Sequence, residues 1–383
     1  MNVPANDHHR QTPLLAILQD SIQRDGPMPV SQYMELCLRH PQYGYYASQT
    51  AIGTAGDFIT APEISQIFGE LIGLWAAVVW QTMQAPTKVR LVEIGPGRGT
   101  LMSDALRAMA NVPGMPEALS VHLVEVSPVL RAAQEETLRA ASIQPVWHTN
   151  LHEIPTDGAT ILIANEFLDT FPVDQYVQTN HGPRLRAVGL DEESNLTFVV
   201  QPDIAIPQRA DALLSGQPEG MVAEVPVAMM EIYEWLAQAR PAPVVALLVD
   251  YGHEEAGPGE TLQAVRSHNF EHVLASPGEA DLSVQVDFSS VTACARAHGL
   301  AVDGPLPQAE FLGQLGILQR ASRLMSANPK LAAEIEASVL RLMAPNGMGT
   351  RFKAIGLRSS ELSPLPGLVR PNTNGSMGGH EVR

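Results

Sequence analysis

The sequence has only two cysteines, Cys37 and Cys294, among 383 residues. Two cysteines cannot build the disulfide framework of a small secreted protein, so we expect a reducing compartment. The longest strongly apolar run, 71–80, has about half the length that a helix needs to cross a bilayer, and it predicts a buried helix. The first residues have neither an apolar core nor an arginine-rich pattern, so no targeting peptide is predicted.

Positive charge is also scarce. The chain has 24 Lys and Arg against 41 Asp and Glu, which gives a formal net charge of −17. A general nucleic-acid-binding protein needs a basic surface that neutralises phosphates, so the composition argues against this class. An acidic surface favours solubility and attracts cationic partners.

The spacing of apolar residues predicts two helices followed by a long α/β region. The helical pattern of 12–39 is interrupted at Gly26-Pro27, which predicts a break between two helices. After residue 86, short apolar runs alternate with helical segments, as in βαβ units whose parallel sheet is buried on both faces. The predicted strands are 89–94, 120–126, 145–148, 159–164, 244–249 and 350–357.

Other stretches depart from this alternation. Residues 175–200 contain two turn signals and predict an antiparallel excursion from the main sheet. Residues 225–240 have the spacing of an amphipathic helix, and 311–343 is predicted to be mostly helical. The end of the chain from Pro364 is rich in Pro, Gly, Asn and Ser, and we expect it to be loose.

Three glycines follow the predicted strand 89–94 in the segment LVEIGPGRGT. An α/β sheet binds ligands beyond the carboxyl ends of its strands, and glycines there let the backbone approach the ligand. A P-loop would need a Lys followed by Ser or Thr, and a dinucleotide fingerprint would need a glycine where Thr100 stands. Glu93, just before the loop, suits a cationic ligand. The pattern therefore favours S-adenosylmethionine, a sulfonium with an amino acid group, over a plain strand-to-helix turn.

A second acid, Glu125, ends the next predicted strand. In sheets of this type an acid at that position binds the two hydroxyls of a ribose. An isolated glutamate at a strand end is often only solvated, but this placement favours a ribose contact.

The motifs in combination resemble one family. The segments GDFITAPEIS, LVEIGPGRGT, HLVEVS, ANEFLDTFPV and LLVDYGH look like those of the MidA family of class I S-adenosylmethionine-dependent methyltransferases. The similarity runs from about residue 15 to 360. The glycine loop alone indicates only a methyltransferase, whereas GDFITAPEIS with ANEFLD is specific to the family. Mitochondrial members are assembly factors of respiratory complex I, so the resemblance implies methylation of an arginine on a complex I subunit.

The resemblance also implies an architecture. We expect a Rossmann-like class I methyltransferase sheet with an N-terminal helical segment and an inserted smaller α+β region. The helical segment, 1–85, is predicted to cover the cofactor site. The methyltransferase domain is predicted at 86–360, with insertions at about 175–225 and 300–345, and a flexible tail at 361–383.

The catalytic residues implied by the resemblance lie in ANEFLD, after the strand 159–164. An arginine is protonated in water, so a carboxylate must orient its guanidinium group and help to remove a proton. Glu166 is predicted to orient it, Asp169 to assist, and Asn165 to contact substrate or cofactor. The two acids are three residues apart, so a helical turn would place both on one face. Capping or solvating a loop is the alternative for Asn165 and Asp169.

The predicted cofactor-binding residues are Glu93, Gly95, Pro96, Gly97, Gly99, Thr100, Glu125, Ser127, Asn150, Leu151, Asn165, Thr60 and Glu63. Asn150 and Leu151 follow a short strand whose end contacts the adenine in related folds. Thr60 and Glu63 have an alternative interpretation, because a Thr followed three residues later by a Glu is the pattern of a helix capping box. Asp250, after another strand, either lines the substrate side or forms a turn.

Other functional classes are less well supported. His148 and His152 are four residues apart, but no Cys or carboxylate pattern completes a metal site, so no metal is predicted. The chain lacks the hydrolase motifs G-x-S-x-G and H-E-x-x-H. The alternatives are a non-catalytic assembly factor or chaperone that binds S-adenosylmethionine, and a nicotinamide oxidoreductase, which the missing third glycine disfavours.

The predicted partner is a protein that carries the target arginine. Neither nucleic acid nor membrane insertion is expected, and a homodimer is left open. The predicted location is a bacterial cytoplasm, or the mitochondrial matrix for a mature eukaryotic chain.

Overall fold

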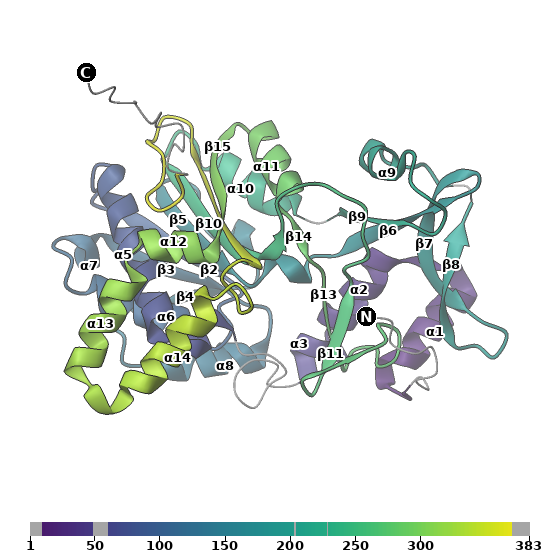
Figure 1. Cartoon of the computed structure of the whole chain (residues 1–383), viewed down its shortest axis with the longest axis horizontal. Helices are drawn as coiled ribbons and strands as arrows, with labels where there is room; N and C mark the ends of the chain where they lie inside the picture. The colour runs from purple at the N-terminus through teal and green to yellow at the C-terminus, as the bar shows by residue number, and fades with distance from the viewer. Residues whose placement is uncertain (1–9, 49–59, 203, 228, 370–383) are drawn as a thin grey trace, which may run out of the picture.

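The computed structural model describes residues 10–48, 60–202, 204–227 and 229–369. These residues form a larger lobe around a mostly parallel sheet and a smaller lobe that contains antiparallel strands (Figure 1). Within the described ranges, no helix is both long and apolar enough to cross a membrane.

The main sheet has eight strands in the order β15-β16-β10-β5-β2-β3-β4, with β14 beside the end of β10. The strands from β10 to β4 are parallel, whereas β16 runs antiparallel to both β10 and β15. The predicted parallel α/β sheet is thus confirmed. The strands are β2 (Val89–Ile94), β3 (Leu119–Val124), β4 (Val146–His148), β5 (Ala159–Asn165), β10 (Val244–His253), β14 (Val286–Asp287), β15 (Leu300–Pro307) and β16 (Phe352–Ser359).

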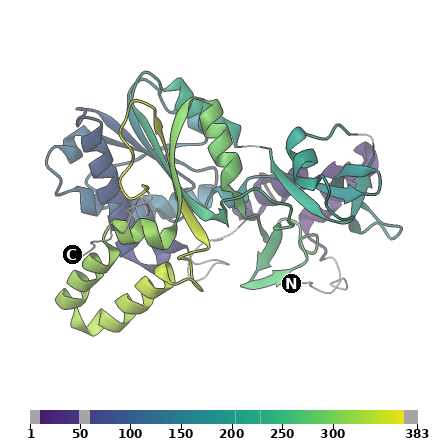
Figure 2. The same cartoon turned by 45° about the horizontal axis from the view of Figure 1, so that its top comes forward.

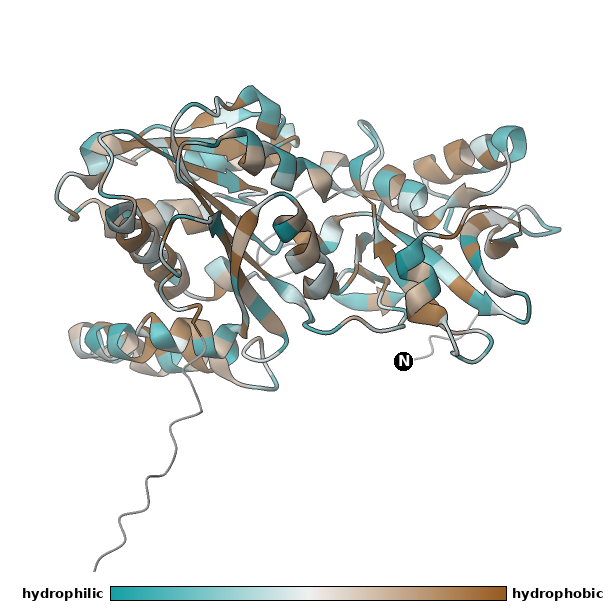
Figure 3. Ribbon diagram, turned by 90° about the horizontal axis from the view of Figure 1, so that it is seen from above, coloured by the Kyte–Doolittle hydropathy of each residue, from teal (hydrophilic) through white to brown (hydrophobic). Residues whose placement is uncertain are grey.

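Helices cover both faces of this sheet, as the apolar strands require. Alternate residues of β5 enter two different cores: Ile161 and Ile163 pack on one face, Leu162 and Ala164 on the other. Brown, apolar residues accordingly follow the central strands in Figure 3. The helices of the first face are α5 (Gln66–Thr82), α6 (Thr100–Met109), α12 (Gln308–Gln314), α13 (Ile317–Ala327) and α14 (Ala332–Met343). Those of the second face are α10 (Met230–Gln238) and α11 (Phe288–Ala297).

Helix α5 contains the apolar run 71–80 and is buried, as predicted. It packs closely on α6 because two glycines bring the backbones together. A Cβ added at Gly69 would lie 2.7 Å from Cβ of Asp104, and one at Gly73 would lie 2.6 Å from Cα of Ala105. Since α6 follows the glycine loop directly, this contact fixes the loop against the sheet. Short helices complete this lobe: α4 (Ala61–Ile64), α7 (Met115–Ala118) and α8 (Pro128–Thr137).

The smaller lobe is assembled from three separated parts of the chain. The two predicted N-terminal helices are present and, rather than lying beside the glycine loop, pack against antiparallel strands in this lobe (Figures 1 and 2). Its helices are α1 (Pro13–Asp25), α2 (Val30–Arg39), α3 (Tyr45–Ser48) and α9 (Gln208–Leu214). Its strands are β1 (Met28–Pro29), β6 (Val173–Thr179), β7 (Gly182–Leu190), β8 (Leu196–Gln201), β9 (Val222–Pro226), β11 (Gln263–Arg266), β12 (Asn269–Glu271) and β13 (Asp281–Ser283).

The antiparallel excursion predicted at 175–200 is confirmed by β6, β7 and β8. Several elements differ from the predictions. The helix expected at 225–240 starts only at Met230, because residues 222–226 pair with β6. Strand β15 was not predicted, since Gly304-Pro305 interrupts it and shifts its register. The end of the chain is packed up to residue 369, with Leu365 and Leu368 buried, and the rest of the predicted tail lies outside the described residues.

The predicted division of the chain into 1–85, 86–360 and 361–383 stays a prediction. The structure gives two observations that bear on where such boundaries fall. Helices α1 and α2 share the core of the smaller lobe, whereas α5 belongs to the core of the larger lobe. Segment 254–285, inside the predicted methyltransferase domain, supplies β11, β12 and β13 to the smaller lobe.

Candidate active site

A small hollow opens at the carboxyl ends of β2 and β5. The two strands are neighbours with Ile94 opposite Ala164, so the residues that follow them meet at one edge of the sheet. Most of the predicted site residues line this hollow: Thr60, Glu63, Glu93, Gly95, Pro96, Gly97, Thr100, Asn165 and Glu166. Pro62, Arg98 and Leu101 complete the lining and were not predicted.

The glycine loop needs its glycines for backbone conformation. Gly95, Gly97 and Gly99 have φ values of +64°, +55° and +81°, in the left-handed region that side chains disfavour. Gly95 is also crowded, because a Cβ there would lie 2.5 Å from Cδ2 of Phe167. Gly99 is the N-cap of α6, so the first N–H groups of that helix adjoin the hollow.

Gly95→Ala is expected to weaken the binding of S-adenosylhomocysteine and to lower the melting temperature. The new methyl group must push the Phe167 ring aside. In addition, the alanine backbone must keep a left-handed conformation, which costs about 1–2 kcal/mol for a residue with a side chain. Titration calorimetry and thermal unfolding measure the two effects. Gly26→Ala is the matched control, because Gly26 has φ +88° and open space around its Cβ. Equal affinities in both variants would contradict a role of the loop in binding.

Glu93 is the most unusual acid of the hollow. It is 3% exposed, and burial raises its pKa to about 8. Its Oε2 has no hydrogen-bond partner among the described residues, and neither has Oδ1 of the neighbouring Asn165. A buried, unpaired carboxylate is stabilised by a cation, and an unpaired amide oxygen by a donor. The hollow therefore fits a ligand with cationic groups, such as the ammonium and sulfonium groups of S-adenosylmethionine.

The free protein is expected to lose stability as the pH rises through about 8, in part because of Glu93. Its pKa in the folded chain lies above the value of about 4.3 in an unfolded chain, so folding favours the protonated form. This contribution is complete below about pH 4.3 and is lost progressively as the pH rises through the folded pKa. Glu93→Gln removes it. Melting temperatures of both proteins over this range should therefore diverge, with the variant relatively more stable at high pH, and parallel curves would refute the interpretation.

Glu125 lies just beyond β3 and is 8% exposed. Its Oε1 accepts a hydrogen bond from the N–H of Ser127 (2.7 Å), and its Oε2 accepts one from Nε2 of Gln134 (3.0 Å). Burial raises the pKa of Glu125, and these hydrogen bonds oppose the rise. Each carboxylate oxygen accepts more than one hydrogen bond, so the group keeps capacity for a ligand's hydroxyls.

Gln134 was not predicted, although it joins two parts of the site. Its Nε2 also donates to the carbonyl oxygen of Gly97 (2.8 Å), and its Oε1 accepts from Nε1 of Trp147 (2.9 Å). It is fully buried and thereby connects the glycine loop to Glu125. The available signal was a polar residue on the apolar face of a helix, four positions from both Leu130 and Leu138.

Six predicted residues are not part of the lining of the hollow: Gly99, Asp169 and four that lie near the ends of β3 and β4. Ser127 is the N-cap of α8 and accepts a hydrogen bond from the N–H of Leu130. Leu151 is buried. The amide of Asn150 donates to Glu153 (2.9 Å), which turns its side chain toward its own loop. Glu125 is the fourth.

The ANEFLD motif begins at the end of β5. Glu166 has φ +51°, and its Oε1 accepts hydrogen bonds from the N–H of Ala61 (2.6 Å) and from Nδ2 of Asn165 (3.3 Å). Burial, with a smaller contribution from the charge of Asp169, raises the pKa of Glu166 to about 7. Burial likewise raises the pKa of Asp169 to about 6, although the hydroxyl of Tyr251 donates to it. Oδ1 of Asp169 has no partner among the described residues.

The expected single helical turn is only partly formed. A 3-10 turn spans Leu168–Thr170, but Glu166 precedes it in a left-handed conformation. The two carboxyl groups are nevertheless close enough to influence each other's ionisation. Glu166 lines the hollow, whereas Asp169 is not part of its lining.

The capping interpretation of Thr60 and Glu63 is only partly confirmed. Thr60 is the N-cap residue of α4, but its side chain makes no capping hydrogen bond, and Glu63 instead accepts a hydrogen bond from the hydroxyl of Thr100. Ser65 is the residue that caps, accepting from the N–H of Ile67 (3.3 Å) on α5. Residues 60–65 are thus attached to the glycine loop through Glu63 and to the ANEFLD motif through Ala61.

Of the two histidines with metal-ligand spacing, His148 and His152, His148 contacts a third histidine. Nδ1 of His122 lies 3.0 Å from Nε2 of His148. In the part of the chain that the structure describes, no group of three or more His, Cys, Asp or Glu side chains is arranged to hold a metal ion.

Known proteins resemble the chain in sequence over most of its length. Residues 71–306 match the model of a family described as S-adenosyl-L-methionine-dependent methyltransferases. Human protein arginine methyltransferase NDUFAF7, mitochondrial, is 35% identical over 372 residues, which cover 90% of this chain and 83% of that protein. The protein of the same name from Danio rerio is 35% identical over 366 residues, covering 89% and 85% of the two chains.

Solved structures share the fold of both lobes. A protein from Burkholderia thailandensis, crystallised with S-adenosylhomocysteine, is 26% identical and superposes with a TM-score of 0.83. The match covers 97% of this chain and 98% of the other. A native crystal structure of a protein from the same organism gives a TM-score of 0.80 with the same coverage.

Proposed function

Since the chain belongs to this family of S-adenosyl-L-methionine-dependent methyltransferases, we propose that it transfers methyl groups to an arginine side chain of a protein. The family and its cofactor are those predicted from the motifs. Arginine as the acceptor is supported by the names of the relatives and by the two half-buried carboxyl groups of Glu166 and Asp169 after β5.

The cofactor supplies an electrophilic methyl group on a sulfonium when it is bound. We assign Glu93, Asn165 and the glycine loop to its cationic amino acid side, where the unpaired oxygens lie. Glu125 is assigned to the ribose, and Asn150 and Leu151 to the adenine. Thr60 and Glu63 also border the hollow, and Glu63 accepts a hydrogen bond from Thr100 of the loop.

Glu166 and Asp169 act on the substrate. Their carboxyl groups hold the guanidinium group by paired hydrogen bonds, which orient the attacking nitrogen. The pKa of Glu166, about 7, is well matched to a base that works near neutral pH. Glu166 therefore accepts the proton that this nitrogen releases when it is methylated.

The protein partner proposed is a subunit of respiratory complex I, with methylation supporting assembly. The support is the resemblance to the MidA family and the name NDUFAF7 shared by the relatives. A net charge of −17 favours a basic target segment. These relatives are named as mitochondrial; for this chain, a bacterial cytoplasm stays the prediction.

The test combines binding with product mapping. S-adenosylmethionine and S-adenosylhomocysteine are titrated into the purified chain and into Gly97→Val, which we expect not to bind. Unassembled complex I subunits are then incubated with the chain and the cofactor, and methylated residues are mapped by tandem mass spectrometry. Methylarginine that depends on the chain supports the proposal. Cofactor binding without any methylated arginine would favour the alternative, a non-catalytic assembly factor.

A further inference from the structure

Asp250 makes an unusual set of contacts with the ANEFLD motif. It lies in β10, the neighbour of β5, and is completely buried. Its Oδ2 accepts hydrogen bonds from three successive N–H groups, those of Phe167 (3.0 Å), Leu168 (2.8 Å) and Asp169 (3.1 Å). Its Oδ1 accepts a fourth, from the N–H of Tyr251 (2.8 Å). Asp250 is therefore directed into the backbone of the motif and not toward a substrate.

These contacts define the path of the chain after β5. Strands β5 and β10 are in register up to Asn165 opposite Val249, and the N–H of Glu166 donates to the carbonyl oxygen of Val249 (2.8 Å). Beyond that point the sheet provides no further pairing to the motif. The carboxyl group of Asp250 takes over, because its Oδ2 accepts hydrogen bonds from three converging N–H groups. Burial and the charges of Asp169 and Glu166 raise the pKa of Asp250, and the backbone hydrogen bonds oppose the rise. Asp250, a residue of the sheet, thus fixes the backbone of residues 167–169, which do not pair with a strand of that sheet.

The backbone conformation of Glu166 has to be held in place by neighbouring residues. Its φ of +51° is sparsely populated for a residue with a side chain and persists only where the surroundings impose it. The turn is held from two sides: Asp250 binds the backbone after Glu166, and Ala61 donates to the Glu166 carboxylate. If the Asp250 contacts were lost, the turn could relax and both carboxyl groups would move.

We infer that Asp250 is a positioning residue of the methyl transfer. It fixes the backbone of residues 167–169 so that Glu166 and Asp169 present their carboxyl groups to the substrate guanidinium. This inference rests on the proposed function. Asp250 itself contacts neither substrate nor cofactor, so its removal affects turnover and leaves cofactor affinity nearly unchanged.

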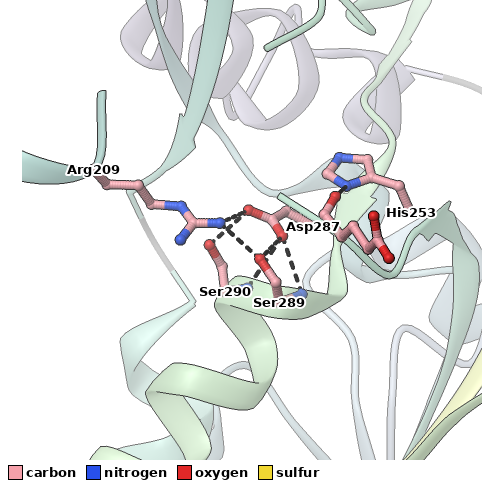
Figure 4. Close-up of polar contacts among 6 residues, drawn as sticks. Arg209, His253, Asp287, Ser289 and Ser290 are labelled. Atoms are coloured by element: carbon pink, nitrogen blue, oxygen red, sulfur yellow. Dashed lines mark hydrogen bonds and ion pairs between the residues drawn. The ribbon is translucent and has the colours of Figure 1, made fainter. Parts of the chain in front are cut away.

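Asp287 offers a matched control. It too is a buried aspartate, 7% exposed, and its Oδ1 accepts hydrogen bonds from the N–H groups of Ser289 (3.0 Å) and Ser290 (3.1 Å). Figure 4 shows it at the start of α11, between these serines and Arg209, with which it forms an ion pair. It makes the same kind of backbone contact as Asp250, but none of these partners belongs to the motif.

The kinetic test compares Asp250→Asn with Asp287→Asn. Asparagine keeps the size of the side chain, whereas Asp250→Ala would leave four buried N–H groups unpaired and threaten folding. We expect Asp250→Asn to lower kcat for an arginine-bearing protein substrate about 100-fold, as misplacement by about 1 Å does. Its affinity for S-adenosylhomocysteine should stay within about twofold of the wild type. Asp287→Asn should lower the melting temperature and keep kcat. A wild-type kcat in Asp250→Asn, or equal losses of kcat in both variants, would overturn the inference.

A second measurement separates this inference from the proposed function. The Glu166 carboxyl group is titrated by ¹³C NMR, which requires no turnover. The wild-type pKa of about 7 should fall toward the ordinary glutamate value in Asp250→Asn as the group moves into solvent, and should not change in Asp287→Asn. Because Asp250 also interacts with Glu166 through its charge, the backbone amide shifts of residues 166–169 are recorded in the same samples, and they should change only in Asp250→Asn. If the wild type methylates no arginine, the proposed function fails, and this titration alone decides whether Asp250 positions Glu166. An unchanged Glu166 pKa in Asp250→Asn would overturn the inference.

Discussion

Glu166→Gln is expected to lower kcat for arginine methylation by a factor of about 10³, because a positioned general base contributes about 10²–10⁴. The substitution removes both the negative charge and the proton acceptor. It preserves the side-chain length, so an amide oxygen can still accept the hydrogen bond from Ala61 that anchors the motif. The melting temperature and the affinity for S-adenosylhomocysteine should therefore change little.

The control for Glu166→Gln is Glu70→Gln. Glu70 is also a buried glutamate, but it lies on α5 and forms ion pairs with Arg107 and Arg320. Its substitution should lower the melting temperature, because it removes the carboxylate that pairs with Arg320 and one of the two carboxylates that pair with Arg107. It should leave kcat unchanged. If Glu166→Gln keeps wild-type turnover, the proton acceptor is another group, and Asp169 is the candidate to be substituted next.

Glu125→Ala is expected to weaken the binding of S-adenosylhomocysteine about 100-fold. A hydrogen bond to a charged group contributes about 1.5–3 kcal/mol, and about 2.7 kcal/mol corresponds to a factor of 100 in affinity. The substitution also removes the partner of Gln134, which holds the glycine loop through Gly97. Titration calorimetry measures the total loss but does not separate the two causes.

A cycle with the 2′-deoxy form of the ligand separates them. If Glu125 binds the ribose hydroxyls, the wild type should bind the deoxy ligand more weakly than the natural one, and Glu125→Ala should bind both equally. If the substitution acts only by loosening the loop, the two losses will add. Additive losses would remove Glu125 from the set of ligand contacts.

The positions of the acids along one edge could be predicted because the parallel strand pattern is local. Each buried strand ends in a recognisable break, and parallel strands place their carboxyl ends side by side. Glu93, Glu125 and Glu166 could thus be assigned to the same edge before any register was known, and Ile94 indeed lies opposite both Val124 and Ala164.

Contacts that depend on how one strand is aligned with its neighbour could not be predicted from the sequence. Asp250 reaches the N–H groups of 167–169 only because Val249 pairs with Asn165, and no local pattern specifies that pairing. Glu63 follows a capping pattern, but the hydroxyl of Thr100, distant in sequence, is its partner in the fold. Strands β11, β12 and β13 have only three or four residues each, too few for an alternation to be recognised.

The smaller lobe has a consequence for how the protein is made. Helices α1 and α2 leave the ribosome well before their partners, which come much later in the chain. The hydroxyl of Tyr33 donates to the carbonyl oxygen of Val273 (2.7 Å), and that of Thr12 donates to the carbonyl oxygen of Pro277 (2.8 Å). At roughly 5–20 residues per second, translation needs on the order of ten seconds or more to supply those partners. During that interval the apolar sides of both helices stay uncovered and require protection from aggregation. The helices that are synthesised first are therefore among the last to be buried.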